Sequence, residues 1–140
     1  MICKTFPLGS CLRYTYVVVF SRYQGNYLFS RHRERITWET QGGHIEQGET
    51  PLEAARRELY EESGAVEYDI VPLFDYWAAE DENDPGAYGQ VFLANVQCLV
   101  AIPDSEMAQT GLFDTLPPEL TYPGITPVLF AKLQEQEELQ

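Results

Sequence analysis

The segment from residue 43 to residue 65 constrains this chain most, because it specifies a helix with a marked beginning and a marked end. Thr50 precedes a proline, and Glu53 follows three residues after Thr50, which is the pattern of an N-cap with a capping box. The residues that follow are rich in strong helix formers, and Gly64 suits a left-handed C-cap. We therefore predict a helix over residues 51–63.

Three carboxylates lie on one side of this predicted helix. Glu58, Glu61 and Glu62 are spaced i, i+3 and i+4, so they project from a single turn and repel one another. A shared divalent cation would relieve that repulsion, and Mg²⁺ and Mn²⁺ prefer oxygen ligands. The alternative is a solvated acidic face with Arg56 and Arg57 as neighbouring counter-charges. The spacing alone leaves both interpretations open.

The whole segment resembles the Nudix box, the signature of the Nudix hydrolase family. Its fixed positions match at Gly43, Glu49, Arg57, Glu58, Glu61, Glu62 and Gly64. Leu59 fits the aliphatic position of the signature, whereas Ala65 is small for the final one. The resemblance implies an α/β (α+β) Nudix fold, with a curved mixed β-sheet sandwiched between α-helices. The patterns by themselves predict only one α+β domain.

The resemblance also implies roles for individual residues. Glu58, Glu61 and Glu62 would ligate Mg²⁺ or Mn²⁺ and take part in catalysis, together with the backbone carbonyl of Gly43. Arg57 and Glu49 would act as a supporting pair that orients the metal-binding glutamates.

The family often adds an acidic ligand from a loop beyond the box. Glu106 is the candidate here, and Asp104 is a weaker alternative. An ordinary loop carboxylate is the other interpretation of Glu106.

The implied reaction is metal-dependent hydrolysis of a diphosphate bond in a nucleoside diphosphate linked to another group. Family markers for ADP-ribose and for dinucleoside polyphosphates are absent at residues 80–83. Elimination favours the MutT-like branch, which converts (deoxy)nucleoside triphosphates, including oxidised ones, to a monophosphate and pyrophosphate. The alternatives are a nucleotide sugar, a dinucleoside polyphosphate, a capped RNA end, or a nucleotide-sensing Nudix domain without catalysis.

Composition bears on partners and location. At 140 residues the chain is expected to form a single domain, residues 1–140. A net charge of −13 disfavours long nucleic acid, whereas a metal can neutralise the phosphates of a small nucleotide. The chain has no apolar run of membrane-spanning length and no evident signal peptide. Its three cysteines lack metal-site spacing, so we expect a cytoplasmic protein, with a homodimer left open.

A basic segment precedes the box. Arg31, Arg33 and Arg35 could contact substrate phosphates, since guanidinium groups match phosphate oxygens. A solvated hairpin end is the alternative. Trp38 is a candidate for contact with the substrate, although an aromatic residue in a strand more often belongs to the core.

The rest of the chain predicts strands around the helix. Extended segments are expected at residues 13–20, 27–31, 36–40, 66–79 and 90–102, with a turn at residues 24–26. A second helix is expected from residue 128 to about residue 139. Leu52, Ala55 and Leu59 are expected to pack the first helix on the core.

Overall fold

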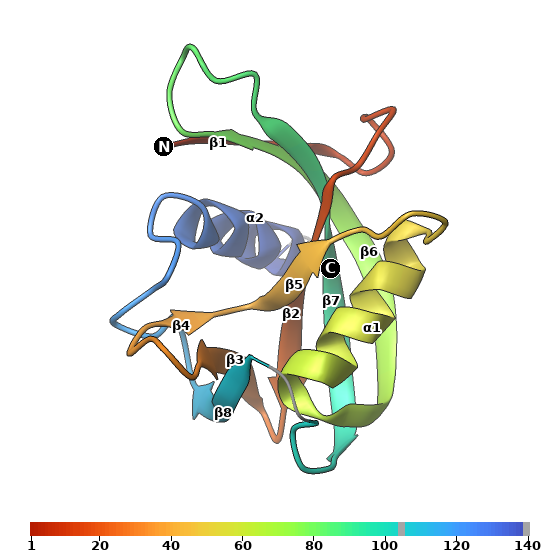
Figure 1. The fold of residues 1–140 in the computed structure, drawn as a ribbon, viewed down its shortest axis with the longest axis vertical. Helices are drawn as coiled ribbons and strands as arrows, with labels where there is room; N and C mark the ends of the chain where they lie inside the picture. The colour runs from red at the N-terminus through yellow and green to blue at the C-terminus, as the bar shows by residue number, and fades with distance from the viewer. Residues whose placement is uncertain (104–105, 139–140) are drawn as a thin grey trace.

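One mixed sheet and two helices make up the described part of the molecule (Figure 1). The structure is a computed structural model and describes residues 1–103 and 106–138. Its elements, in chain order, are β1 (Ile2–Pro7), β2 (Tyr16–Tyr23), β3 (Asn26–His32), β4 (Trp38–Glu39), β5 (Gln41–His44), α1 (Pro51–Ser63), β6 (Ala65–Ala79), β7 (Ala87–Leu99), β8 (Met107–Phe113) and α2 (Thr126–Glu138).

The strands form an eight-stranded sheet in the order β1-β6-β7-β2-β3-β4, with β5 paired to β2 and β8 paired to β3. The central pair β2–β7 is parallel, and the neighbouring pairs β6–β7 and β2–β3 are antiparallel. The sheet is therefore mixed, as the resemblance to the Nudix family implied. The long strands β6 and β7 curve across the molecule (Figure 1).

The helices cover opposite faces of the sheet, because successive side chains of a strand point to opposite sides. On β2, Val17 and Val19 belong to the buried cluster of α1, whereas Phe20 belongs to the cluster of α2. On β7 the same alternation places Phe92 and Ala94 with α1 and their neighbours with α2. This arrangement confirms the predicted sheet between helices.

Helix α1 begins and ends where the sequence predicts. The Thr50 hydroxyl accepts a hydrogen bond from the backbone N–H of Glu53, and the Glu53 carboxylate accepts one from the backbone N–H of Thr50. Gly64 ends the helix with φ 79°. Ala55 and Leu59 are fully buried, as predicted. The prediction for Leu52 is wrong: it is 39% exposed. Leu52 lies in the first turn, and burial along the helix begins only at Ala54.

The predicted hairpin is confirmed. Tyr23 pairs with Asn26 across Gln24 and Gly25, and both turn residues have positive φ, as a tight two-residue hairpin requires. The preceding strand begins later than predicted, at Tyr16. Upstream of it, the carboxylate of Asp75 accepts hydrogen bonds from the backbone N–H of Cys11 and the hydroxyl of Tyr14, which holds residues 11–14 in a loop.

Other boundaries differ from the predictions. The extended segment at residues 36–40 shortens to β4, and residues 87–89 add to the start of β7 while β7 ends at Leu99. Strands β1, β5 and β8 were not predicted from the sequence. Helix α2 begins at Thr126, and residue 139 of its predicted end lies outside the described residues. Among the described helices, none is long and apolar enough to span a membrane.

Candidate active site

The glycine strand β5 brings backbone groups against the carboxylates of α1. The N–H of Gly42 donates a 2.7 Å hydrogen bond to Oε1 of Glu62. Gly42 has φ 152°, and a Cβ at this position would lie 2.3 Å from the carbonyl oxygen of Val17. A Cβ on Gly43 would lie 2.9 Å from Oε1 of Glu58. Gly42 therefore permits the close approach of β5 to β2, and Gly43 permits the approach of β5 to the Glu58 carboxylate of α1.

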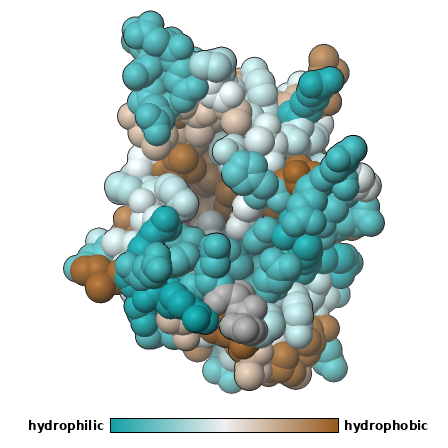
Figure 2. All heavy atoms as spheres, in the orientation of Figure 1, coloured by the Kyte–Doolittle hydropathy of each residue, from teal (hydrophilic) through white to brown (hydrophobic). Residues whose placement is uncertain are grey.

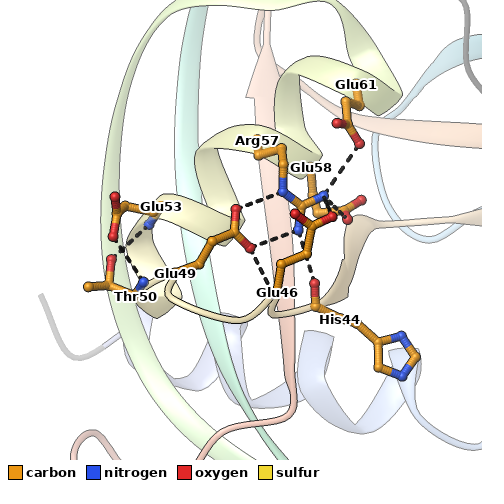
Figure 3. Close-up of polar contacts among 8 residues, drawn as sticks. All are labelled: His44, Glu46, Glu49, Thr50, Glu53, Arg57, Glu58 and Glu61. Carbon is orange, nitrogen blue, oxygen red and sulfur yellow. Dashed lines mark hydrogen bonds and ion pairs between the residues drawn. The ribbon is translucent and has the colours of Figure 1, made fainter.

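Arg57 joins the loop before α1 to the carboxylates of the helix (Figure 3). Its Nε and Nη2 bind the two carboxylate oxygens of Glu49 at 2.7 and 3.0 Å. Nη2 also donates to the carbonyl of His44 at 3.0 Å, and Nη1 lies 2.7 Å from Glu58 and 3.4 Å from Glu61. The hydrogen bonds from Arg57 lower the pKa of Glu49. The forked guanidinium thus fixes the loop and the helix relative to each other.

Two of the three helix carboxylates are removed from water. The side chain of Glu58 is 13% exposed, and burial raises its pKa despite the adjacent guanidinium of Arg57. Burial also raises the pKa of Glu62 to about 9, against the opposing effect of the Gly42 hydrogen bond. The side chain of Glu61 is 46% exposed. A solvated acidic face therefore does not describe Glu58 and Glu62.

The donors fit a hard divalent cation. Among the described residues, no three His, Cys, Asp or Glu side chains are already placed to hold a metal ion together. Arg57 contacts both Glu58 and Glu61 (Figure 3). Carboxylate oxygens and a backbone carbonyl are nevertheless the ligand types that Mg²⁺ and Mn²⁺ take. A cation beside Glu62 would favour the ionised form that burial disfavours.

A cavity of about 560 Å³ adjoins the glycine strand. Its lining includes Tyr16, Glu39, Gly42, Gly43, His44, Tyr76, Tyr122 and Leu129. The rings of Tyr16 and His44 lie 4.4 Å apart. Figure 2 shows this face hollowed, with apolar surface inside and hydrophilic residues around it. The volume lies within the range of pockets for small molecules.

The structure separates the three arginines of the basic segment. Arg35 donates to Oε2 of Glu39 at 3.2 Å, and its hydrogen bond to Tyr122 raises the pKa of the guanidinium. Because Glu39 and Tyr122 line the cavity, Arg35 stands at its border. Arg31 instead donates to the carbonyl of Arg35 and to Gln109, each at 2.7 Å. The backbone N–H of Arg33 donates to the carbonyl of Glu106.

Two other predicted site residues have partners outside these groups. The described residues that line the cavity do not include Trp38, whose ring packs edge-on against Phe113 at 5.0 Å. The carboxylate of Glu106 is 85% exposed and lies 3.5 Å from Nε2 of His32. Asp104 lies outside the described residues.

The sequence analysis did not single out four residues that line the cavity: Tyr16, Glu39, His44 and Tyr122. His44 lies at a variable position of the box, so the signature does not mark it. Tyr16 and Tyr122 are more than one hundred residues apart in the chain, and no local pattern brings them together.

Comparison with known proteins identifies the family. A model of the NUDIX domain matches residues 12–118. This chain belongs to the Nudix hydrolase family. Within this Nudix hydrolase, the match includes the whole of α1 and the strand β5 that faces it.

Curated relatives match over shorter stretches. An RNA pyrophosphohydrolase of Helicobacter pylori (strain G27) is 48% identical over 44 residues, which are 31% of this chain and 28% of the relative. An RNA pyrophosphohydrolase of Bartonella clarridgeiae is 31% identical over an alignment of 87 residues that covers 56% of this chain and 48% of the relative. The chain thus spans less than half the length of these relatives.

Solved structures share the fold. A Bacillus subtilis pyrophosphohydrolase aligns with a TM-score of 0.78 and 24% identity, covering 96% of this chain and 90% of the other. A MutT Nudix hydrolase of Burkholderia pseudomallei aligns with a TM-score of 0.58 and 20% identity, covering 86% of this chain and 95% of the other. At these identities the likeness concerns the fold.

Proposed function

We propose that this Nudix hydrolase is a divalent-metal-dependent pyrophosphohydrolase of (deoxy)nucleoside triphosphates, including oxidised ones, that releases a monophosphate and pyrophosphate. The observation that carries this proposal is the position of the half-buried carboxylates Glu58 and Glu62. They lie against Gly42 and Gly43, which also line a cavity of about 560 Å³. Residues 1–140 would act as a single domain in the cytoplasm.

Mg²⁺ or Mn²⁺ would be held by Glu58, Glu61, Glu62 and the carbonyl of Gly43, with Glu106 as a further candidate ligand. When bound, such an ion supplies Lewis-acid polarisation of phosphoryl oxygens and lowers the pKa of water. The contact of Arg57 with Glu58 and Glu61 supports this assignment, because it shows that both carboxylates can face one positive charge.

The protein's own groups would perform the remaining tasks. The pair Arg57–Glu49 ties the loop to the helix and so holds Glu58 in place. A carboxylate accepts the proton of the attacking water, and Glu58, Glu62 and Glu106 are the candidates.

The substrate would place its base in the cavity. Tyr16 and His44 offer ring surface for stacking. Arg35 at the border offers a guanidinium to the phosphates. Arg31, Arg33 and Trp38 remain weaker proposals for substrate contact, since Arg31 and Trp38 have partners within the fold.

A second candidate substrate is the 5′-triphosphate end of RNA. The curated relatives that carry the name RNA pyrophosphohydrolase favour it, and the same bond would be cleaved. The net charge of −13 opposes it, because the protein's field repels a long phosphate backbone.

The deciding experiment compares nucleoside triphosphates, their oxidised forms and 5′-triphosphate RNA oligonucleotides, each with Mg²⁺ or Mn²⁺. Products are identified by mass, and Glu62→Gln serves as the control for contaminating activity. We expect monophosphate and pyrophosphate from a free triphosphate with the higher kcat/KM. A higher kcat/KM for the RNA end would select the second candidate. Turnover of neither class would refute both.

A further inference from the structure

A chain of buried polar side chains runs beneath the last turn of α1. Ser21, Ser30 and Gln41 are at most 1% exposed and come from β2, β3 and β5. Ser21 Oγ lies 2.5 Å from Gln41 Oε1, and Gln41 Nε2 lies 2.9 Å from Ser30 Oγ. Ser30 Oγ in turn lies 2.8 Å from the backbone carbonyl of Glu62.

The direction of this chain is set by its last member. A carbonyl can only accept, so the Ser30 hydroxyl must donate to Glu62. The Ser30 oxygen then accepts from the Gln41 amide N–H, which turns the Gln41 carbonyl towards Ser21. Ser21 donates its hydroxyl to that carbonyl. These contacts fix the orientation of the Gln41 amide, and the carbonyl of Leu28 is a further acceptor 3.2 Å from both Gln41 Nε2 and Ser21 Oγ.

The carbonyl of Glu62 needs such a donor. It is one of the last four carbonyls of α1, which have no partner within a helix. At the other end of the same residue, Oε1 of Glu62 accepts from the N–H of Gly42, the residue after Gln41. Gln41 therefore reaches the backbone carbonyl of Glu62 through Ser30, whereas Gly42 contacts the Glu62 carboxylate directly.

We propose that Ser30 and Gln41 are positioning residues for Glu62. They hold the main chain of Glu62 at a fixed distance from β5, so that its carboxylate meets the Gly42–Gly43 strand where the cation would bind. The proposal rests on the proposed function, because it takes Glu62 to be a metal ligand.

A purely structural role would be different. Buried hydrogen bonds among strands also stabilise the core, and their loss would lower the melting temperature without changing metal affinity. Ser21 provides the matched control, because its hydroxyl is equally buried and binds the same Gln41 but does not reach Glu62.

The experiment measures Mn²⁺ binding to the protein alone, by electron paramagnetic resonance of free Mn²⁺ without nucleotide. Melting temperatures are recorded for the same samples. The variants are Ser30→Ala, Ser21→Ala, Ser30→Thr and Glu62→Gln. We expect Ser30→Ala to raise the Mn²⁺ Kd about tenfold, as the loss of a partner that orients a ligand does. Ser21→Ala should change the Kd by less than about twofold at a similar loss of melting temperature, because it leaves the Ser30 contact in place.

Ser30→Thr keeps the hydroxyl and should restore most of the affinity. If Ser30→Ala does not fold, Ser30→Cys fills the same space with a weaker donor and should raise the Kd in the same direction. One outcome would overturn the positioning role alone: the wild type, Ser21→Ala and the Ser30 variant have equal Kd values for Mn²⁺, and Glu62→Gln binds Mn²⁺ more weakly. Equal Kd values for the wild type and Glu62→Gln would instead refute the metal site, and with it both proposals.

Discussion

Replacing Glu62 by glutamine should stabilise the metal-free protein, and the gain should grow with pH. The folded-state pKa of Glu62 is raised by burial from 4.5 to about 9. Below pH 4.5 the carboxyl is protonated in both the folded and the unfolded chain. As the pH rises from 4.5 to 9, the Glu62 carboxyl ionises in the unfolded chain but stays protonated in the folded one. The free energy of unfolding of the wild type therefore falls over that pH range.

The structure sets the size of this effect. At pH 7 the unfolded carboxyl is ionised and the folded one is protonated, and 2.5 pH units above 4.5 correspond to about 3 kcal/mol. At pH 5 the same reasoning leaves less than about 1 kcal/mol. Glutamine does not titrate, and its side-chain carbonyl can still accept the hydrogen bond from Gly42. Glu62→Gln should therefore exceed the wild type in stability by about 3 kcal/mol at pH 7.

The assay is urea unfolding in excess chelator at pH 5, 7 and 8.5. The matched control is Glu61→Gln, which removes a charge from the same turn where the side chain is 46% exposed; its effect should stay within about 1 kcal/mol, as for exposed charges. Added Mg²⁺ should stabilise the wild type more than Glu62→Gln. A difference between Glu62→Gln and wild type that stays constant from pH 5 to pH 8.5 would refute the reasoning.

Three further predictions concern activity. Hydrolysis should stop in excess chelator and return with Mg²⁺ or Mn²⁺, and full activity in chelator would exclude the metal mechanism. Glu49→Gln should lower kcat/KM by roughly 10- to 100-fold with the fold intact by circular dichroism, because Arg57 loses its bidentate partner; unchanged kcat/KM would show that the pair is only structural. Arg35→Ala should raise KM about tenfold if Arg35 contacts phosphate. Arg31→Ala should raise KM less than about twofold, because the Arg31 guanidinium already donates to the carbonyl of Arg35 and to Gln109 of β8. Equal KM values for these two variants would contradict the assignment.

Local signals made α1 predictable from the sequence. Its N-cap, its capping box and its C-terminal glycine each act within a few residues, so they need no knowledge of the fold. The hairpin turn at Gln24 and Gly25 is a signal of the same kind. The predicted burial of Leu52 was wrong because burial depends on where the sheet lies beneath the helix. The helical period of the sequence does not specify that position.

The cavity and the polar chain could not be predicted in the same way. Tyr16 and Tyr122 line the same cavity, although one comes from β2 and the other from the segment before α2. In the sequence, Gln41 is a polar residue next to two glycines, and nothing marks it as buried. It is buried in the fold, where β5 pairs with β2. The positions of these side chains are set by tertiary contacts, so they cannot be predicted from the sequence of any one strand or loop.

Helix α1 shields charged carboxylates from water, which costs stability, and neighbouring groups of the site offset part of that cost. Glu58 and Glu62 lie on the side of the helix that also buries Ala55 and Leu59, where apolar residues would give a more stable fold. Arg57 offsets part of the charge at Glu58, and Gly42 offers one hydrogen bond to Glu62. Neither restores the usual pKa of these carboxyls. A cation would satisfy both carboxylates at once, and departures from local stability rules of this kind are expected at functional sites.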